Sequence, residues 1–422
     1  MNKYESPKYR SYVLVVLTLV YAVNFIDRQL LTILQESIKV ELDLSDLQLG
    51  LLTGLAFAIF YVLAGIPIAR LAERSNRRNI IAASIGIWSV MTAISGFVVN
   101  YTQLVLARIG VGVGEAGCSP PAHSMISDMY PPEKRASALS FYSAGINIGI
   151  MFGILFGGII NEYFGWRVAF MVVGLPGVAI ALLVWWTVQE PIRGWSEKNT
   201  VEQQPASFNR VLSFILARKY LIHVSIAAGL SAFAGYSITN WAPPFFIRSF
   251  GMGTAELGWW LAVSVGLFGA VGTFLWGVMC DRFGKRDKRW YTWLPAMAIF
   301  LAIIPIVIVF STENRTVALI ANLFPAFFLT GYLGASLAIF HGAVEPRMRA
   351  TSSALFFLVL NIIGLGCGPT MVGFVSDLLQ PTMGAESLRY AVLYVVPVVC
   401  VWAAIHFMLA ARDMAKYESE SA

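Results

Sequence analysis

The sequence predicts an all-α membrane protein with twelve transmembrane helices in two pseudo-symmetric six-helix bundles. Hydrophobic residues make up 57% of the 422 residues and charged residues only 13%, against about 25% charged in soluble domains. A soluble protein this apolar would have too few polar residues to cover its surface. The apolar positions suffice for roughly twelve spans of about 20 residues each.

A duplicated charge signature predicts the two bundles. Residues 69–78 and 277–286, about 208 positions apart, each carry an acid–Arg pair and a basic cluster between two apolar runs. A second landmark, at 135–138 and again at 349–352, repeats at nearly the same offset. Two landmarks at matching separation indicate a duplicated membrane unit whose halves are parallel repeats.

The predicted spans are the apolar runs, taken in chain order. They lie near 11–34, 48–69, 80–98, 102–125, 137–161, 167–188, 219–247, 255–279, 291–311, 316–343, 350–376 and 388–411. Each must be a helix, because backbone amides inside a bilayer have to be satisfied within their own segment. We therefore expect bundles at 1–190 and 219–422, joined by a cytoplasmic linker at 191–218 that contains Gln203, Gln204 and Pro205.

The loop charges predict the topology. Most Lys and Arg residues fall in alternate segments that include both termini, whereas the opposite loops hold only Lys39, Arg167, Arg248, Arg315 and Arg389. Basic loops stay in the cytoplasm, so we expect both termini there, in a bacterial inner membrane. The first outer loop is acidic, with Glu36, Glu41, Asp43 and Asp46.

Several function classes are excluded. The net charge is +6, but the Lys and Arg residues are gathered in alternate loops and form no nucleic-acid-binding face. The four cysteines show no pairing or metal-ligand spacing. Residues 112–117 match G-x-G-x-x-G, but that fingerprint needs a strand-to-helix turn and here lies within a membrane helix. We expect no catalytic residue, no metal and no cofactor, including ATP, and a monomer.

Four charged residues lie well inside the apolar runs: Asp27, Arg28, Arg108 and Glu115. Each is a functional candidate because a charge within the membrane is costly. The first span runs outward and the fourth inward, which places Asp27 and Arg108 at similar depth, with Glu115 two turns deeper. We expect Asp27 to meet Arg108, and Arg28 to serve a different partner, because adjacent helix residues do not face each other.

Glu115 has small neighbours, Gly112, Gly114, Ala116 and Gly117, which we expect to leave room for water or ligand. Burial disfavours the charged form of a carboxylate, so Glu115 should take up a proton near neutral pH. A proton relay is the functional interpretation of the four charges. The structural alternative is an ion-pair network that only locks the first span to the fourth.

The fifth span carries Gly145, Gly149, Gly153 and Gly157, each four residues apart. This spacing predicts a smooth strip for close helix approach, along which one bundle can rock against the other.

The second half has no charge within the membrane but many aromatic residues. A cavity charged on one wall and aromatic on the other suits an amphipathic solute. The candidate cavity residues are Asn24, Asn147, Tyr236, Trp241, Tyr332 and Phe357.

The acid–Arg loops are the candidate conformational latch. Their charged residues would pair with helix ends across the halves in the outward-facing state, where an acid can meet a positive helix N-terminus. The latch residues are Glu73, Arg74, Arg77, Asp281, Arg282, Lys285 and Arg286.

Along essentially its whole length the chain resembles the major facilitator superfamily. The acid–Arg loops look like its signature between helices 2 and 3 and between 8 and 9; the first copy departs from it at Ala69, Glu73 and Asn76. Residues 108–112 look like its helix-4 signature. Residues 24–28, 76–78, 88–89, 108–116 and 190–194 are most similar to the spinster-like branch.

The resemblance implies alternating access, and proton coupling by residues matching Asp27, Arg28, Arg108 and Glu115. Animal members of the branch move lysophospholipids and sphingoid phosphates, which implies a lipid-like substrate. A proton symporter for a small organic acid is the alternative, with Arg28 or Arg108 holding the carboxylate. A membrane sensor or an intramembrane enzyme is disfavoured, because the sequence has no soluble signalling domain and no His-Glu-x-x-His or Ser-His-Asp arrangement.

Overall fold

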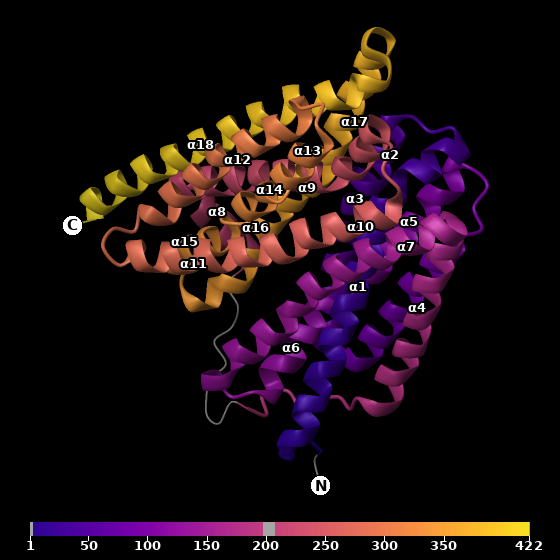
Figure 1. The fold of residues 1–422 in the computed structure, drawn as a ribbon. Helices are drawn as coiled ribbons and strands as arrows, with labels where there is room; N and C mark the ends of the chain where they lie inside the picture. The colour runs from indigo at the N-terminus through magenta and orange to yellow at the C-terminus, as the bar shows by residue number, and fades with distance from the viewer. Residues whose placement is uncertain (1–2, 197–206, 422) are drawn as a thin grey trace. The chain divides into compact units, whose positions relative to one another are not determined.

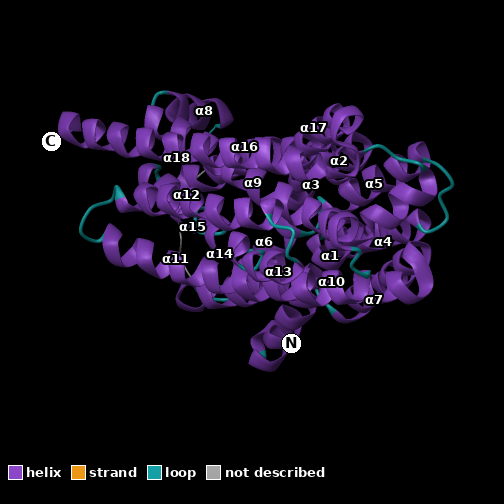
Figure 2. Cartoon of the chain, turned by 45° about the horizontal axis from the view of Figure 1, so that its top comes forward, coloured by secondary structure: helices purple, strands orange, loops and turns teal. Residues whose placement is uncertain are grey.

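A computed structural model describes residues 3–196 and 207–421, and every regular element within them is helical (Figures 1 and 2). The first half contains η1 (Lys3–Glu5), α1 (Pro7–Leu42), α2 (Asp46–Thr53), α3 (Leu55–Arg74), α4 (Arg77–Ser95), α5 (Tyr101–Glu115), α6 (Ser119–Met129) and α7 (Pro132–Thr187). The rest comprises α8 (Phe208–Leu216), α9 (Lys219–Phe250), α10 (Thr254–Leu261), η2 (Ala262–Phe268), α11 (Gly269–Gly284), α12 (Trp290–Ser311), α13 (Arg315–Ala321), α14 (Phe324–Leu329), α15 (Leu333–Ala343), η3 (Pro346–Met348), α16 (Arg349–Leu360), η4 (Asn361–Cys367), α17 (Gly368–Met383), η5 (Gly384–Glu386) and α18 (Ser387–Ser421).

The helices account for the predicted spans. In the described residues, nine helical stretches are long and apolar enough to cross a membrane. Two of these stretches, 133–187 and 351–417, each cover two predicted spans, and the fourth predicted span falls on α5 and α6, which are not among the nine. The first of the double stretches turns at Gly165, whose φ of 82° is open to glycine but strained for other residues.

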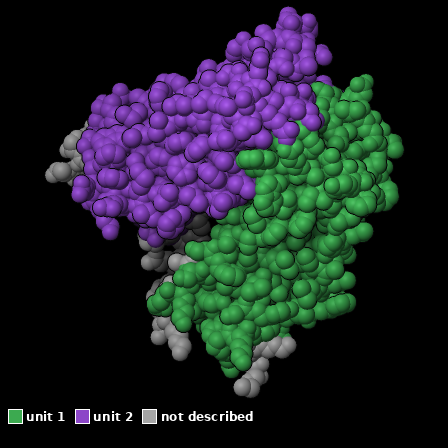
Figure 3. Space-filling view, in the orientation of Figure 1, with its two compact units in different colours: residues 1–44, 56–201, 252–262 green, residues 45–55, 202–251, 263–422 purple. Residues whose placement is uncertain are grey.

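The chain forms two compact units that exchange short segments (Figure 3). Unit 1 contains residues 1–44, 56–201 and 252–262, and unit 2 contains residues 45–55, 202–251 and 263–422. The segment 45–55 of the first sequence half thus packs within unit 2, and the segment 252–262 of the second half packs within unit 1. The bundle boundaries at 190 and 219 remain a prediction, and part of the predicted linker, 197–206, lies outside the described residues.

Several predicted spans are interrupted, among them the fourth, between α5 and α6, and the tenth, which is divided among α13, α14 and α15. The second predicted span breaks between α2 and α3 at Gly54, which has non-helical φ and ψ of −106° and −103°. The eighth and eleventh spans contain the π-helical segments η2 and η4. Such wider turns are rare and often mark functional positions. The chain passes between the units at 55–56, beside the break at Gly54, and at 262–263, at the start of η2.

Unit 1 is built on the close packing of α1 against α7. A Cβ at Gly149 would lie 2.3 Å from the carbonyl oxygen of Ala22, and one at Gly153 would lie 2.8 Å from that of Ile26. The glycine strip therefore brings two backbones together, as predicted. Its partner is α1 in the same unit, and the strip fixes the part of α1 that carries Asp27 and Arg28.

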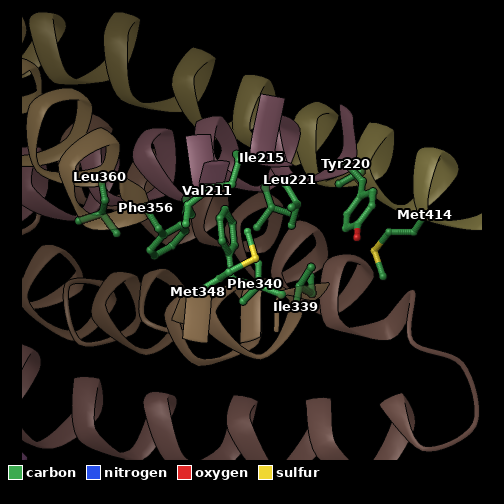
Figure 4. Packing of buried hydrophobic residues seen from close by; sticks show 14 of the residues in the cluster. Val211, Ile215, Tyr220, Leu221, Ile339, Phe340, Met348, Phe356, Leu360 and Met414 are labelled. Carbon is green, nitrogen blue, oxygen red and sulfur yellow. The ribbon is translucent and has the colours of Figure 1, made fainter. Parts of the chain in front are cut away.

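Unit 2 has an apolar core on α8, α9, α15, α16 and α18 (Figure 4). Val211 and Ile215 of α8 are buried in it beside Leu221 of α9. Phe340 and Phe356 meet at 5.1 Å between ring centroids. The end of the predicted linker is thus a helix that packs on unit 2.

Candidate functional site

The four intramembrane charges come together within unit 1. Asp27 and Arg28 lie on α1, and Arg108 and Glu115 lie on α5. Asp27, Arg108 and Glu115 are all at most 3% exposed. Glu115 is the last residue of α5. The next helix, α6, begins at Ser119 and has Pro120 and Pro121 in its first turn. The negative end of the α5 dipole therefore lies at Glu115 and favours a cation beside it.

The charges form two acid–base pairs. Arg108 Nη1 lies 3.8 Å from Asp27 Oδ1, and Arg28 Nε donates to Glu115 Oε2 at 2.5 Å. This confirms both predictions about pairing, that Asp27 meets Arg108 and that Arg28 serves another partner. The first distance is too long for a hydrogen bond and the second is a short, charge-assisted one. One pair is therefore loose and the other tight.

Thr92 of α4 is a partner that the sequence did not reveal. Its hydroxyl is fully buried and donates a hydrogen bond to Asp27 Oδ2. A threonine in an apolar helix is common and gives no signal of its own. The contact brings a third helix to the acidic side chain, so α1, α4 and α5 meet at Asp27.

Aromatic rings surround the arginines, which the sequence also did not reveal. The Arg28 guanidinium lies 5.1 Å from the ring of Phe25, 5.0 Å from that of Phe57 and 4.8 Å from that of Tyr61. The Phe57 ring is also 5.5 Å from the Arg108 guanidinium. Ring faces attract cations within about 6 Å, so Phe57 on α3 stabilises one member of each pair.

The glycines around Glu115 do not leave open space, contrary to expectation. A Cβ at Gly114 would lie 2.7 Å from the backbone nitrogen of Trp88, and one at Gly117 would lie 2.1 Å from Ser84 Oγ. These glycines let α5 and the turn that follows it approach α4 closely. Glu115 itself is 1% exposed, and electrostatic interactions are stronger at such a buried position than in water.

Arg77, a predicted latch residue, lies in a network within unit 1. Its side chain is 1% exposed, donates to Glu190 Oε1 at 2.6 Å and also contacts Asp128 and Ser124. The Arg78 backbone N–H donates to the other oxygen of Glu190. The start of α4 is thereby joined to α6 and to the segment after α7.

The other candidate latch residues are exposed: Glu73, Arg74, Asp281, Arg282, Lys285 and Arg286. The Tyr291 hydroxyl donates to Asp281 Oδ1 at 3.1 Å. In the same loop, hydrogen bonds from Arg289 hold the pKa of Asp287 below its usual value.

The candidate cavity residues differ in exposure. Asn24 is buried one turn before Asp27, and Asn147 is exposed on α7. Tyr236 and Tyr332 pack against the core of unit 2, and Phe357 is 38% exposed. Trp241 is fully buried, and its indole N–H donates to the carbonyl of Pro369 at 2.9 Å. In this structure Trp241 joins α9 to α17.

Comparison with known proteins assigns the chain to a family. The chain matches the family described as Major Facilitator Superfamily over residues 17–369 and 224–421. It is 34% identical to an MFS-type efflux pump of Mycolicibacterium smegmatis over 94% of this chain and 91% of the pump. It is 26% identical to a probable L-galactonate transporter of Escherichia coli over 84% of this chain and 80% of that protein.

A solved structure gives the same assignment. The crystal structure of a bacterial homolog of the human lysosomal transporter Spinster, in an inward-facing and unoccupied conformation, matches with a TM-score of 0.90 and 34% identity. The match covers 97% of this chain and 98% of that one. The family, the helical fold and the resemblance to the spinster-like branch are therefore confirmed.

Proposed function

The chain belongs to the major facilitator superfamily of membrane transporters, and from that premise we propose that it couples the movement of an amphipathic organic solute to protons. The observation that carries the proposal is the pair of buried acid–base contacts in unit 1, Asp27 with Arg108 and Glu115 with Arg28. Buried ion pairs are costly to desolvate, and ionisable groups inside membrane spans are by default functional.

Protonation of Glu115 would change what Arg28 can bind. The carboxylate now accepts the short bond from Arg28 Nε, and a proton on Glu115 removes the charge that strengthens it. Arg28, whose side chain is 18% exposed, then becomes able to hold an anionic group of the substrate. Proton uptake and substrate binding are coupled through this exchange of partners. Asp27 and Arg108 form the second step of the relay.

The apolar part of the substrate would meet aromatic side chains of the second half. Tyr236, Tyr332 and Phe357 are all partly exposed. A lysophospholipid-like or sphingoid-like molecule has one charged head and one long tail, and so uses both kinds of surface. The ground for this class is the resemblance to the spinster-like branch, whose animal members move such molecules.

A flux assay in proteoliposomes with an imposed pH gradient tests the proposal. We expect gradient-driven uptake of labelled lysolipid, and tighter binding along a homologous series by up to about 0.8 kcal/mol per buried CH₂. An uptake rate that does not depend on the pH gradient would contradict proton coupling. A flat response to tail length would contradict the substrate class.

The second candidate is a proton symporter for a small organic acid. It is favoured by the similarity to a probable L-galactonate transporter, whose substrate is a sugar acid. In this case Arg28 or Arg108 holds the carboxylate. Tight binding of short carboxylates that Arg108→Lys abolishes, with no effect of tail length, would select this candidate.

We also propose that the exposed charges of the acid–Arg loops act as the cytoplasmic latch. Glu73 and Arg74 of the first loop, and Asp281, Arg282, Lys285 and Arg286 of the second, are free of the network that holds Arg77. Arg77 would anchor its loop while its exposed neighbours change partners. Neutralising Arg282 should speed the transition between states more than neutralising Lys288, a basic residue of the same loop outside the latch.

A further inference from the structure

The segment 45–55 is docked into unit 2 by a carboxylate of the other sequence half. Asp377 of α17 accepts the backbone N–H groups of Asp46 and Leu47, one on each oxygen and both at 2.9 Å. These two amides open α2, where N–H groups have no partner within the helix. Asp377 therefore caps a helix that comes from about 330 residues away in the chain.

The side chain of Asp46 adds a buried ion pair to this contact. Arg248 Nη1 and Nη2 donate to its two carboxylate oxygens, both at 2.8 Å, and Ser376 Oγ donates to Oδ2 at 2.7 Å. Asp46 is 2% exposed. A bidentate pair of this kind is strong and directional, and loss of either partner leaves a buried charge behind.

Glycines let the two backbones meet at the same place. A Cβ on Gly373 would lie 2.3 Å from the carbonyl oxygen of Asp46, and one on Gly50 would lie 2.5 Å from that of Pro369. No side chain fits between α2 and α17 here. The docked segment thus fits against α17 in one specific position.

Unit 1 contains a related contact. Glu162 of α7 accepts the backbone N–H of Thr254, the first residue of α10, at 2.6 Å. The Thr254 hydroxyl donates to the carbonyl of Gly158 at 2.8 Å, and Asn161 Nδ2 donates to that hydroxyl at 3.2 Å. A Cβ at Gly158 would lie 2.3 Å from the Thr254 carbonyl oxygen, so these backbones also touch.

The two contacts are related by the internal repeat. Asp46 and Thr254 are about 208 positions apart, the offset of the two acid–Arg loops, and Glu162 and Asp377 are about 215 apart. In each contact a carboxylate of one half caps the first turn of a helix from the other half. All four positions lie at the predicted outer ends of their spans. Among the described residues, the buried ion pair, Asp46 with Arg248, belongs to the contact in unit 2.

We propose that Asp377 and Glu162 are paired positioning residues of the transport cycle, which hold the outer ends of the two halves together until both helix caps are released. The stronger α2 contact, with its Asp46–Arg248 pair, sets how often the outer side opens. The proposal rests on the proposed function in one respect, that the transporter alternates between outward-facing and inward-facing states, and it needs neither the proton coupling nor the substrate class.

Cysteine labelling tests the cap directly. Leu49 is a fully buried residue of the docked α2 segment, so in a Leu49→Cys background a thiol reagent reacts only when the segment undocks. Asp377→Asn leaves one acceptor oxygen for two N–H groups, and we expect it to raise the labelling rate of purified protein about fivefold. An unchanged rate would overturn the proposal.

Two controls separate undocking from general damage. Glu386→Gln removes another carboxylate near the same end of the protein, one that pairs with Arg389, and should leave labelling of the Leu49→Cys protein unchanged. Val224→Cys places a thiol at a fully buried position of the unit 2 core. This thiol should stay unreactive in the Asp377→Asn background. If it reacts and the melting temperature falls, the faster labelling of Leu49→Cys results from unfolding, and the proposal is overturned.

Cross-linking tests whether the contacts must open, with both capping carboxylates left in place. The Asn161 and Thr254 side chains meet at 3.2 Å, so a cysteine pair at these positions is within reach of a short thiol cross-linker. A reducible cross-link should abolish transport, and reduction should restore it. Full transport by the cross-linked protein would overturn the proposal. Absence of transport in the uncross-linked parent would contradict the proposed function instead.

Discussion

Each of the four intramembrane charges has a partner of opposite sign, and the two pairs differ in geometry. Glu115 accepts a 2.5 Å bond from Arg28, whereas Asp27 is 3.8 Å from Arg108 and is bonded instead to Thr92. The tight pair must be broken for its members to act, and the loose pair can exchange partners at lower cost. Variants of single residues should therefore separate the two.

The first prediction concerns Glu115. Glu115→Gln keeps the shape of the side chain but cannot carry the proton that the proposed coupling requires. We expect proton-driven accumulation to be abolished and substrate exchange without net proton movement to be retained. Both are measured as flux in proteoliposomes, with and without a pH gradient. Wild-type pH dependence of the Glu115→Gln protein would remove this residue from the mechanism.

The second prediction concerns Phe57, whose ring lies within 5.0 Å of one guanidinium and 5.5 Å of the other. Phe57→Leu keeps an apolar side chain and removes the ring, a loss of about 0.5–2 kcal/mol for each cation. We expect a shifted pH profile of transport with little change in melting temperature. Phe60→Leu alters an exposed ring on the same helix and serves as the control. A profile that matches wild type would show that the ring only fills space.

At the scale of helices, glycines determine which elements approach each other. The third prediction compares Gly149→Ala with Gly65→Ala. The new Cβ at 149 would lie 2.3 Å from the Ala22 oxygen, whereas the one at 65 has nothing within 4 Å. Overpacking should destabilise the first protein by about 1–3 kcal/mol and leave the second unchanged or slightly more stable. Melting of purified protein measures both, and equal melting temperatures would contradict the close α1–α7 contact.

The same scale shows what the sequence predicts and what it does not. The meeting of Asp27 with Arg108 followed from helix direction and rise alone, because both are fixed for membrane helices. The partners Thr92 and Phe57 were missed because these residue types are ordinary in apolar helices. The break at Gly54 and the π-helical turns of η2 and η4 were missed because they hardly change the hydropathy of a span.

At the scale of the whole molecule, the duplicated sequence folds into two units that exchange segments. Repeats at matching separation predicted the two bundles, but not that 45–55 and 252–262 pack with the opposite unit. That exchange depends on contacts between distant residues, such as Asp46 with Arg248, which leave no local pattern in the sequence.

The fourth prediction concerns topology. Glu313 is exposed in a loop with few basic residues and Lys285 is exposed in a basic loop. By the charge rule, Glu313→Cys should react with an impermeant thiol reagent in intact cells and Lys285→Cys should react only after permeabilisation. The parent protein supplies the background from its own cysteines. Reversed labelling would show that the predicted orientation of the whole chain in the membrane is wrong.

The interruptions at Gly54 and in η2 have a consequence for amide hydrogen exchange. Backbone N–H groups at a helix break or in a wide turn lack the regular four-residue ladder and open at lower cost than their neighbours. We expect peptides covering 52–56 and 262–268 to take up deuterium faster than peptides from the middle of α3 or α11, although all lie within membrane spans. A cross-link between cysteines at positions 161 and 254 should slow the exchange in 262–268. The cross-link holds α10 in place, so the segment that follows it opens less often.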